Sequence, residues 1–208
     1  MIPLVIDGMD KKVVIFGGGR VAARKAAYFS GECRITVISR SFCDEIRSFG
    51  AELVEKEITD AGDSELKEYL EGAFMAIGAT SDLSVNTRIA DVCRRMNILF
   101  NSADASKGDV FMPSMIRGEN YCVAVTTYGK SPAVPAYIRE ILQDEIRDLD
   151  GVIEVQDELR EYLKKVEPSG EKRAEILRAV IRDRDIRNLS ANDTGLAIRK
   201  AKKRYIHG

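Results

Sequence analysis

The fold is decided by residues 13–29, which read VVIFGGGRVAARKAAYF. The first four residues form an apolar, β-branched run that is typical of a buried strand, and Val21 to Phe29 have the composition of a helix. Between them, Gly17, Gly19 and Ala22 follow the spacing Gly-x-Gly-x-x-Ala. Between a strand and a helix, this spacing indicates the phosphate-binding turn of a dinucleotide-binding domain.

Each small residue of this turn has a physical task. We expect Gly17 to permit the tight turn, Gly19 to let the backbone approach a pyrophosphate, and Ala22 to let the helix pack closely on the strand. The unpaired N–H groups and the positive dipole end of the helix attract phosphate groups.

Outward from this stretch, short apolar runs alternate with helical segments. Parallel strands need crossover helices, so the alternation predicts an α/β fold with a doubly wound parallel sheet. Ser41 is the predicted N-cap of the second helix, with Asp44 completing a capping box. The predicted strands are 13–16, 35–38, 52–54, 74–77 and 98–100, and the predicted helices are 21–29, 41–49, 66–70 and 85–96.

The alternation changes after about residue 110. The later chain predicts a strand at 121–126, a turn at 129–132, a helix at 134–149 and two or three small helices from residue 152. We therefore expect three parts, namely a Rossmann domain, an appended αβ region and a small helical C-terminal domain, at 1–110, 111–150 and 151–208.

Composition excludes several functional classes. The 208 residues include 32 Lys and Arg against 33 Asp and Glu, for a net charge of -1, which gives no case for a nucleic-acid partner or an anionic membrane. Four scattered cysteines and one histidine predict neither a disulfide scaffold nor a metal site. No apolar run approaches the roughly 20 residues that span a bilayer, and Asp7 and Asp10 do not suit a signal peptide, so we expect a cytoplasmic protein.

The end of the second strand leaves the choice of dinucleotide open. This fold usually places an acidic residue there for the adenosine ribose, but the sequence reads Ser39-Arg40-Ser41. Arg40 could bind the 2′-phosphate of NADP, or it could stack on adenine while the serine hydroxyls hold an unphosphorylated ribose. The spacing alone is compatible with both.

Ligands of open α/β sheets bind beyond the carboxyl ends of the strands, so residues after the fourth and fifth strands are candidates for the same pocket. Thr80 offers a hydroxyl there, and Asn101 and Asp104 are expected near a nicotinamide ring. Asp104 is the best candidate for moving a proton, since burial can raise a carboxyl pKa toward neutral pH. The alternative is that Asp104 only caps or turns its loop.

Five segments together resemble the siroheme-synthase N-terminal family, which comprises precorrin-2 dehydrogenases, some of which are also sirohydrochlorin ferrochelatases. The likeness runs in order through nearly all of residues 1–150. The occurrence of all five segments in one chain is far more specific than the glycine spacing alone. The segments are 17–26 (GGGRVAARKA), 78–80 with Asn86, 101–105 (NSADA), 111–114 (FMPS) and 123–132 (VAVTTYGKSP).

The resemblance implies an activity and a set of roles. It implies a homodimer, with a dimerisation region at 111–150, in which NAD⁺ takes a hydride from precorrin-2 to give sirohydrochlorin. By matching motif, the residues expected to contact NAD include Arg20, Val21, Arg40 and Ser41, and Asp104 falls on the family's essential aspartate. The family's preference for NAD favours NAD over NADP here.

The resemblance leads to three further expectations. Thr127 stands where some members carry a serine, which makes it a second candidate catalytic residue. Insertion of Fe²⁺ into sirohydrochlorin is a possible second activity. Residues 151–208 hold 14 Lys and Arg against 10 Asp and Glu, and a basic cluster within them could help to hold the carboxylate-rich substrate, namely Arg199, Lys200, Lys202, Lys203 and Arg204.

Two other functional classes compete with this hypothesis. A non-catalytic module that senses NAD(H) would need the dinucleotide turn but no proton-transfer residue. An ordinary dehydrogenase of a small substrate is disfavoured, because the chain after the Rossmann part lacks the histidine or the Tyr/Lys pair that such enzymes often use; Tyr128 and Lys130 do not have the spacing for one helical face.

Overall fold

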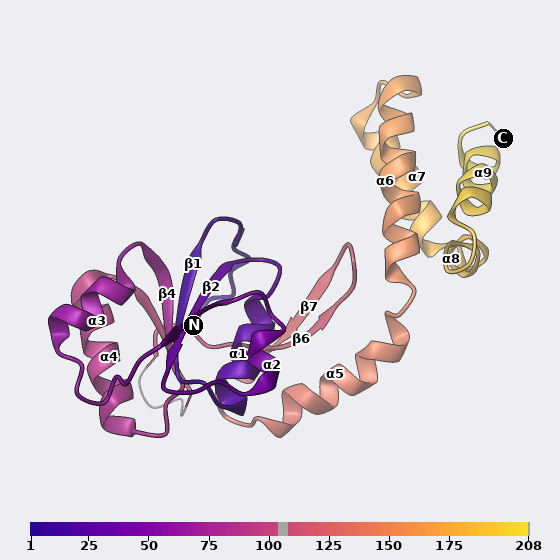
Figure 1. Ribbon diagram of the computed structural model, residues 1–208. Coiled ribbons are helices and arrows are strands. Elements are labelled where there is room, and N and C mark those ends of the chain that lie inside the picture. The colour runs from indigo at the N-terminus through magenta and orange to yellow at the C-terminus, as the bar shows by residue number, and fades with distance from the viewer. Residues whose placement is uncertain (104–107, 208) are drawn as a thin grey trace. The chain divides into compact units, whose positions relative to one another are not determined.

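The structure is a computed structural model that describes residues 1–103 and 108–207. The chain forms two compact units, Met1–Met112 and Pro113–Gly208 (Figure 1). The second unit contains most of the predicted αβ region together with the predicted helical domain. The three-part division of the chain therefore stays a prediction.

The first unit is built on a five-stranded parallel sheet with the order β3-β2-β1-β4-β5. This confirms the predicted doubly wound α/β fold. The chain order reverses between β1 and β4, the point at which such sheets bind their ligands. The strands are β1 (Lys12–Phe16), β2 (Arg34–Ser39), β3 (Glu52–Glu55), β4 (Ala73–Gly78) and β5 (Leu99–Ser102).

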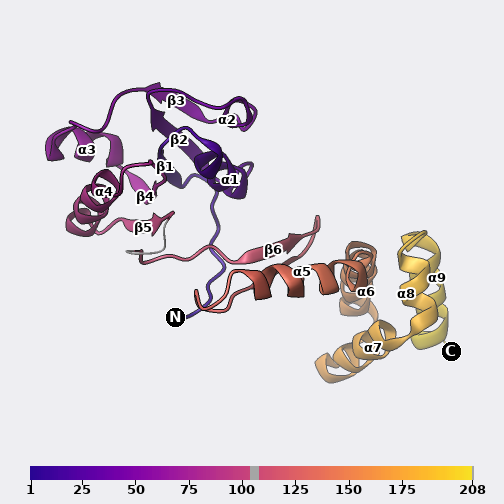
Figure 2. The same cartoon turned by 90° about the horizontal axis from the view of Figure 1, so that it is seen from below.

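Helices cover both faces of this sheet (Figure 2). Val13 and Ile15 of β1 face the side covered by α1 and α2, whereas Val14 and Phe16 face the side covered by α3 and α4. A strand that is buried on both faces is apolar at successive positions, which is why residues 13–16 predicted it. The helices are α1 (Arg20–Phe29), α2 (Asp44–Arg47), α3 (Asp63–Leu70) and α4 (Leu83–Met96).

The predicted start of the second helix is wrong. The helix α2 has only four residues, its N-cap is Cys43, and no side chain caps it. Residues before it run along the glycine turn instead, where the Cys43 N–H donates to the Gly18 carbonyl oxygen at 2.9 Å. Ser41 is therefore held against the turn and does not cap a helix.

Residues 113–207 of the second unit form a β-hairpin and five helices. The strand β6 (Ser114–Arg117), which the sequence did not predict, pairs antiparallel with β7 (Cys122–Val125). The predicted helix 134–149 is instead α5 (Ala133–Glu145), followed by the start of α6 (Leu149–Val166). The Asp150 carboxylate accepts from the N–H groups of Glu119 and Asn120, at 3.1 and 2.7 Å, which fixes the start of α6 to the hairpin turn.

Residues 149–207 form four helices, whereas the sequence predicted two or three. Leu159 of α6 is fully buried in their shared core, which also contains Val180, Ile186, Ala197 and Ala201. None of the helices found in residues 1–103 and 108–207 has the length and apolar character needed to cross a membrane. The remaining helices are α7 (Gly170–Arg182), α8 (Arg184–Ser190) and α9 (Thr194–Tyr205).

A pair of leucines tests the core assignment of the first unit. Leu66 of α3 is 0% exposed and Leu4 is 72% exposed. We predict that Leu66→Ala lowers the free energy of unfolding by about 2–5 kcal/mol, because it leaves a cavity, and that Leu4→Ala changes it by less than about 0.5 kcal/mol. Urea unfolding followed by far-UV circular dichroism measures both. Equal effects of the two substitutions would contradict the assignment.

Candidate functional site

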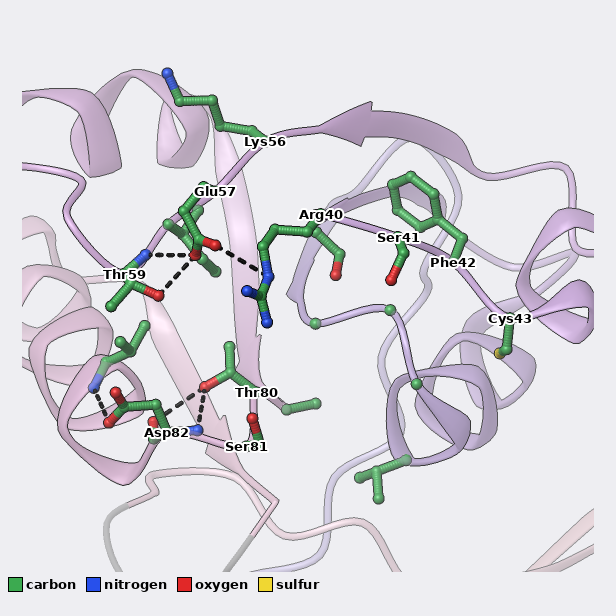
Figure 3. A pocket seen from close by; sticks show the side chains of 18 of the residues that line it. Arg40, Ser41, Phe42, Cys43, Lys56, Glu57, Thr59, Thr80, Ser81 and Asp82 are labelled. Carbon is green, nitrogen blue, oxygen red and sulfur yellow. Dashed lines mark hydrogen bonds and ion pairs between the residues drawn. The ribbon is translucent and has the colours of Figure 1, made fainter.

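A cleft of about 660 Å³ opens at the carboxyl edge of the parallel sheet. Four segments form most of its wall, and each follows a different strand (Figure 3). Parallel strands end at the same edge, so segments far apart in the sequence meet there. The segments are residues 17–21 after β1, 39–43 around the end of β2, 56–59 after β3 and 79–82 after β4.

The glycine turn has two closed positions and one open position. Gly17 has a φ of +122°, and a Cβ there would overlap the Ala79 carbonyl oxygen. A Cβ on Gly18 would overlap the Ser41 carbonyl oxygen, whereas a Cβ on Gly19 would meet no atom within 4 Å. Gly17 and Gly18 therefore allow close backbone contacts within the protein, and Gly19 faces space that a ligand can use.

The helix α1 begins at this open position without a side-chain cap. Gly19 is its N-cap, no side chain accepts from the first N–H groups, and the first turn has no acidic residue. The first residue of the helix is Arg20, whose positive charge is unfavourable at the positive end of a helix dipole. An anion bound at this end would pair with the N–H groups and with Arg20, so the residues present fit a dinucleotide pyrophosphate.

Arg40 and Glu57 face each other across the cleft wall (Figure 3). The Arg40 Nε lies 2.9 Å from Glu57 Oε2. The other carboxylate oxygen accepts from the N–H and the hydroxyl of Thr59, at 3.0 and 2.6 Å. These bonds from Thr59, with the Arg40 charge as a weaker cause, lower the pKa of Glu57, so its carboxylate is ionised at neutral pH.

Thr80 is tied to the start of α4. Its hydroxyl lies 2.8 Å from Asn86 Oδ1, and the Asn86 Nδ2 donates to the Thr80 carbonyl oxygen at 3.1 Å. Asp82 caps α4 by accepting from the N–H groups of Ser84 and Val85. Hydrogen bonds from Ser84 lower the pKa of Asp82, which fits a capping carboxylate. Thr80 therefore lines the cleft in a fixed conformation.

Seven of the eight predicted cofactor-binding residues line this one cleft, and Asn101 does not. Asn101 is buried at the end of β5, where its Nδ2 donates to the Val110 carbonyl oxygen at 2.7 Å. Its Oδ1 is buried and has no partner within the described ranges. The role of all eight residues in binding a cofactor stays a prediction. The seven that line the cleft are Gly17, Gly19, Arg20, Val21, Arg40, Ser41 and Thr80.

Neither predicted catalytic residue is among the described residues that line this cleft. Asp104 lies outside the described residues, which stop at 103 and resume at 108. Thr127 belongs to the second unit, where its hydroxyl donates to the Ser131 carbonyl oxygen at 2.7 Å and accepts from the Ser131 N–H at 3.2 Å. The Thr127 hydroxyl thus closes the turn after β7. A catalytic role for either residue stays a prediction.

Much of the basic cluster at the end of the chain is already paired. Arg204 forms ion pairs with Asp183 and Asp185, and Lys200 lies 3.4 Å from Asp185. Lys202 lies 3.4 Å from Glu158 of α6 and sits over the Tyr162 ring. These contacts hold α9 against α6 and α8. They leave a weaker case for this cluster as a substrate-binding surface than the sequence indicated.

The sequence did not predict that residues 56–59, after β3, form part of the wall of the cleft. Lys56, Glu57 and Thr59 line it, and none was predicted as a site residue. The available signal was the end of the predicted strand 52–54, which lies beside the end of 35–38 in a parallel sheet. The backbone confirms that proximity, because the Lys56 N–H donates to the Ser39 carbonyl oxygen at 3.0 Å.

Known proteins are similar to this chain in sequence and in fold. A family model described as "Putative NAD(P)-binding" matches residues 4–114. A precorrin-2 dehydrogenase of Methanosarcina barkeri is 36% identical over 90% of this chain and 85% of its own length. One from Bacillus subtilis is 34% identical over 74% of this chain and 94% of its own length.

The fold is shared with a solved structure as well. The structure of SirC, a precorrin-2 dehydrogenase, matches with a TM-score of 0.75 at 23% identity, covering 96% of this chain and 100% of the other. This likeness concerns the fold alone, and the sequence matches establish the family. The chain therefore belongs to the precorrin-2 dehydrogenase family and carries its NAD(P)-binding domain.

Proposed function

We propose that this protein oxidises precorrin-2 to sirohydrochlorin with NAD⁺. The observation that carries the proposal is the uncapped start of α1 at Gly19, which opens into the cleft of an NAD(P)-binding domain in this family. Bound NAD⁺ supplies the hydride acceptor. Precorrin-2 loses a hydride to NAD⁺ and a proton to a base, so the products are sirohydrochlorin, NADH and a proton.

In this proposal, different residues of the cleft bind different parts of the dinucleotide. The N–H groups of the first turn of α1, together with Arg20, hold the pyrophosphate. Arg40 and Ser41 hold the adenosine half beside the ends of β2 and β3. Thr80, after β4, is left for the nicotinamide half, with Asn101 at the end of β5 nearby in the sheet order.

Asp104 is proposed to accept the proton or to orient the macrocycle. It follows the end of β5 by two residues, and β5 pairs with β4, whose exit lines the cleft. General-base catalysis by such a carboxylate typically contributes about 10²–10⁴ in rate. A contribution of Thr127 and insertion of Fe²⁺ into sirohydrochlorin stay predictions that rest on the family resemblance.

The second unit supports the proposal of a homodimer. The helix α5 buries only Pro135, and Val134, Tyr137 and Ile141 are exposed at the spacing of one helical face. The sheet beside it has only two strands, an arrangement that is marginally stable alone. A second copy of the chain would cover this face.

A reducing compartment, and hence the cytoplasm, is proposed from the cysteines. All four are free in the structure. Burial raises the pKa of the Cys93 thiol to about 12, so that this thiol stays protonated and unreactive.

The turnover test is an anaerobic incubation of the protein with precorrin-2 and NAD⁺. We expect NADH and sirohydrochlorin in equal amounts. Asp104→Asn is predicted to lower turnover by about 10²–10⁴ while the protein still binds NAD⁺. The matched control Asp109→Asn removes the same charge a few residues away and should keep most of the turnover. No products from the folded wild-type protein would refute the proposed function.

Gly19 tests the pyrophosphate site directly. Gly19→Ala places a methyl group in open space and keeps the fold, but it blocks the approach of the pyrophosphate, so we predict an NAD⁺ affinity at least about tenfold weaker. Gly62→Ala is the matched control, since Gly62 is the N-cap of α3 and is equally open. Titration calorimetry measures both variants. Equal affinities would place the pyrophosphate elsewhere.

The dimer proposal predicts that a charge on the exposed face of α5 separates the copies. Ile141→Asp buries a carboxylate in the proposed interface and should give a monomer, whereas Gln143→Asp adds the same charge on another face and should leave a dimer. Light scattering after size exclusion measures the mass. A wild-type protein at the mass of one chain would refute the dimer.

A further inference from the structure

The cleft contains a carboxylate that neither the glycine turn nor the family resemblance assigned. Dinucleotide-binding sheets usually place an acidic residue at the end of the second strand, where this chain has Arg40. Two carboxylates line the described cleft, Glu57 and Asp82. Asp82 is used as the cap of α4, so Glu57 is the carboxylate available beside the adenosine half.

Glu57 is held in position by contacts with Thr59 and Arg40. Thr59 donates to one carboxylate oxygen from its N–H and its hydroxyl, and Arg40 pairs with the other oxygen. The loop that carries these contacts is itself held by α4, because the Arg88 guanidinium donates to the carbonyl oxygens of Ile58 and Thr59 at 2.9 and 2.8 Å. The carboxylate is therefore placed before any ligand arrives.

Building on the proposed function, we propose that Glu57 is a specificity-determining residue that makes this protein select NAD over NADP. The two dinucleotides differ by one phosphate on the adenosine 2′-hydroxyl. An arginine after the second strand would ordinarily favour that phosphate. Here Glu57 pairs with the Arg40 Nε and adds a negative charge, so a 2′-phosphate meets an arginine whose charge is offset, together with a like charge.

The ion pair between Arg40 and Glu57 influences ligand binding more than the stability of the fold. The side chains of Arg40 and Glu57 are 73% and 41% exposed, and exposed ion pairs contribute little to stability. The same pair lies in the wall of the cleft, where a second negative group would approach it closely. Like charges brought together at a binding site weaken the binding of the wrong ligand.

The test is the ratio of the dissociation constants for NADP⁺ and NAD⁺, measured by titration calorimetry on the full chain. Glu57→Gln keeps a side-chain oxygen for the Thr59 bonds and removes the charge. We expect the ratio to fall by about tenfold or more, since Arg40 becomes free for the 2′-phosphate. Glu55→Gln, an exposed residue outside the cleft, removes the same charge and should leave the ratio at the wild-type value.

The double variant Arg40→Ala, Glu57→Gln separates attraction from repulsion. If Arg40 captures the phosphate in Glu57→Gln, the double variant loses most of the gain for NADP⁺. An unchanged ratio in Glu57→Gln, while NAD⁺ still binds to the wild type, overturns this inference alone. A folded wild-type protein that binds neither dinucleotide overturns the proposed function and this inference with it.

Discussion

The turn between β1 and α1 lies so close to two other backbone segments that neither Gly17 nor Gly18 has room for a side chain. Gly17 lies against Ala79, and Gly18 lies against Ser41. These contacts lie where β2 and β4, which pair with β1, end beside it, and the cleft forms at this edge of the sheet together with the end of β3. The start of α1 is then the part of this turn that stays open, and its N–H groups are the natural partners of a pyrophosphate.

The rest of the cleft depends on this arrangement. Ser41 contacts the turn, which keeps residues 39–43 along the wall of the cleft, and α2 begins only at Asp44. The parallel pairing of β2 and β3 then brings Glu57 to Arg40. The edge of the sheet, which suits phosphate groups in general, thereby has a charged pair that would distinguish NAD from NADP.

The sequence predicted the parts of the fold whose signal is local. Residues 13–16 are apolar at every position because helices cover both faces of the sheet, and their burial follows directly. The start of α2 was predicted wrongly, since Ser41 has the chemistry of a cap but its backbone is held by Gly18. The strand β6 was missed because its four residues, SMIR, lack alternation and depend on pairing with β7. Glu57 was missed because only strand pairing brings it to Arg40.

The cleft serves its proposed function only if the exposed amide groups at the start of α1 bind the pyrophosphate of NAD. A crystal structure of the NAD⁺ complex measures this most directly. We expect pyrophosphate oxygens within hydrogen-bond distance of the N–H groups of Arg20 and Val21, with the adenosine half toward Arg40. A pyrophosphate bound away from the glycine turn would contradict the claim.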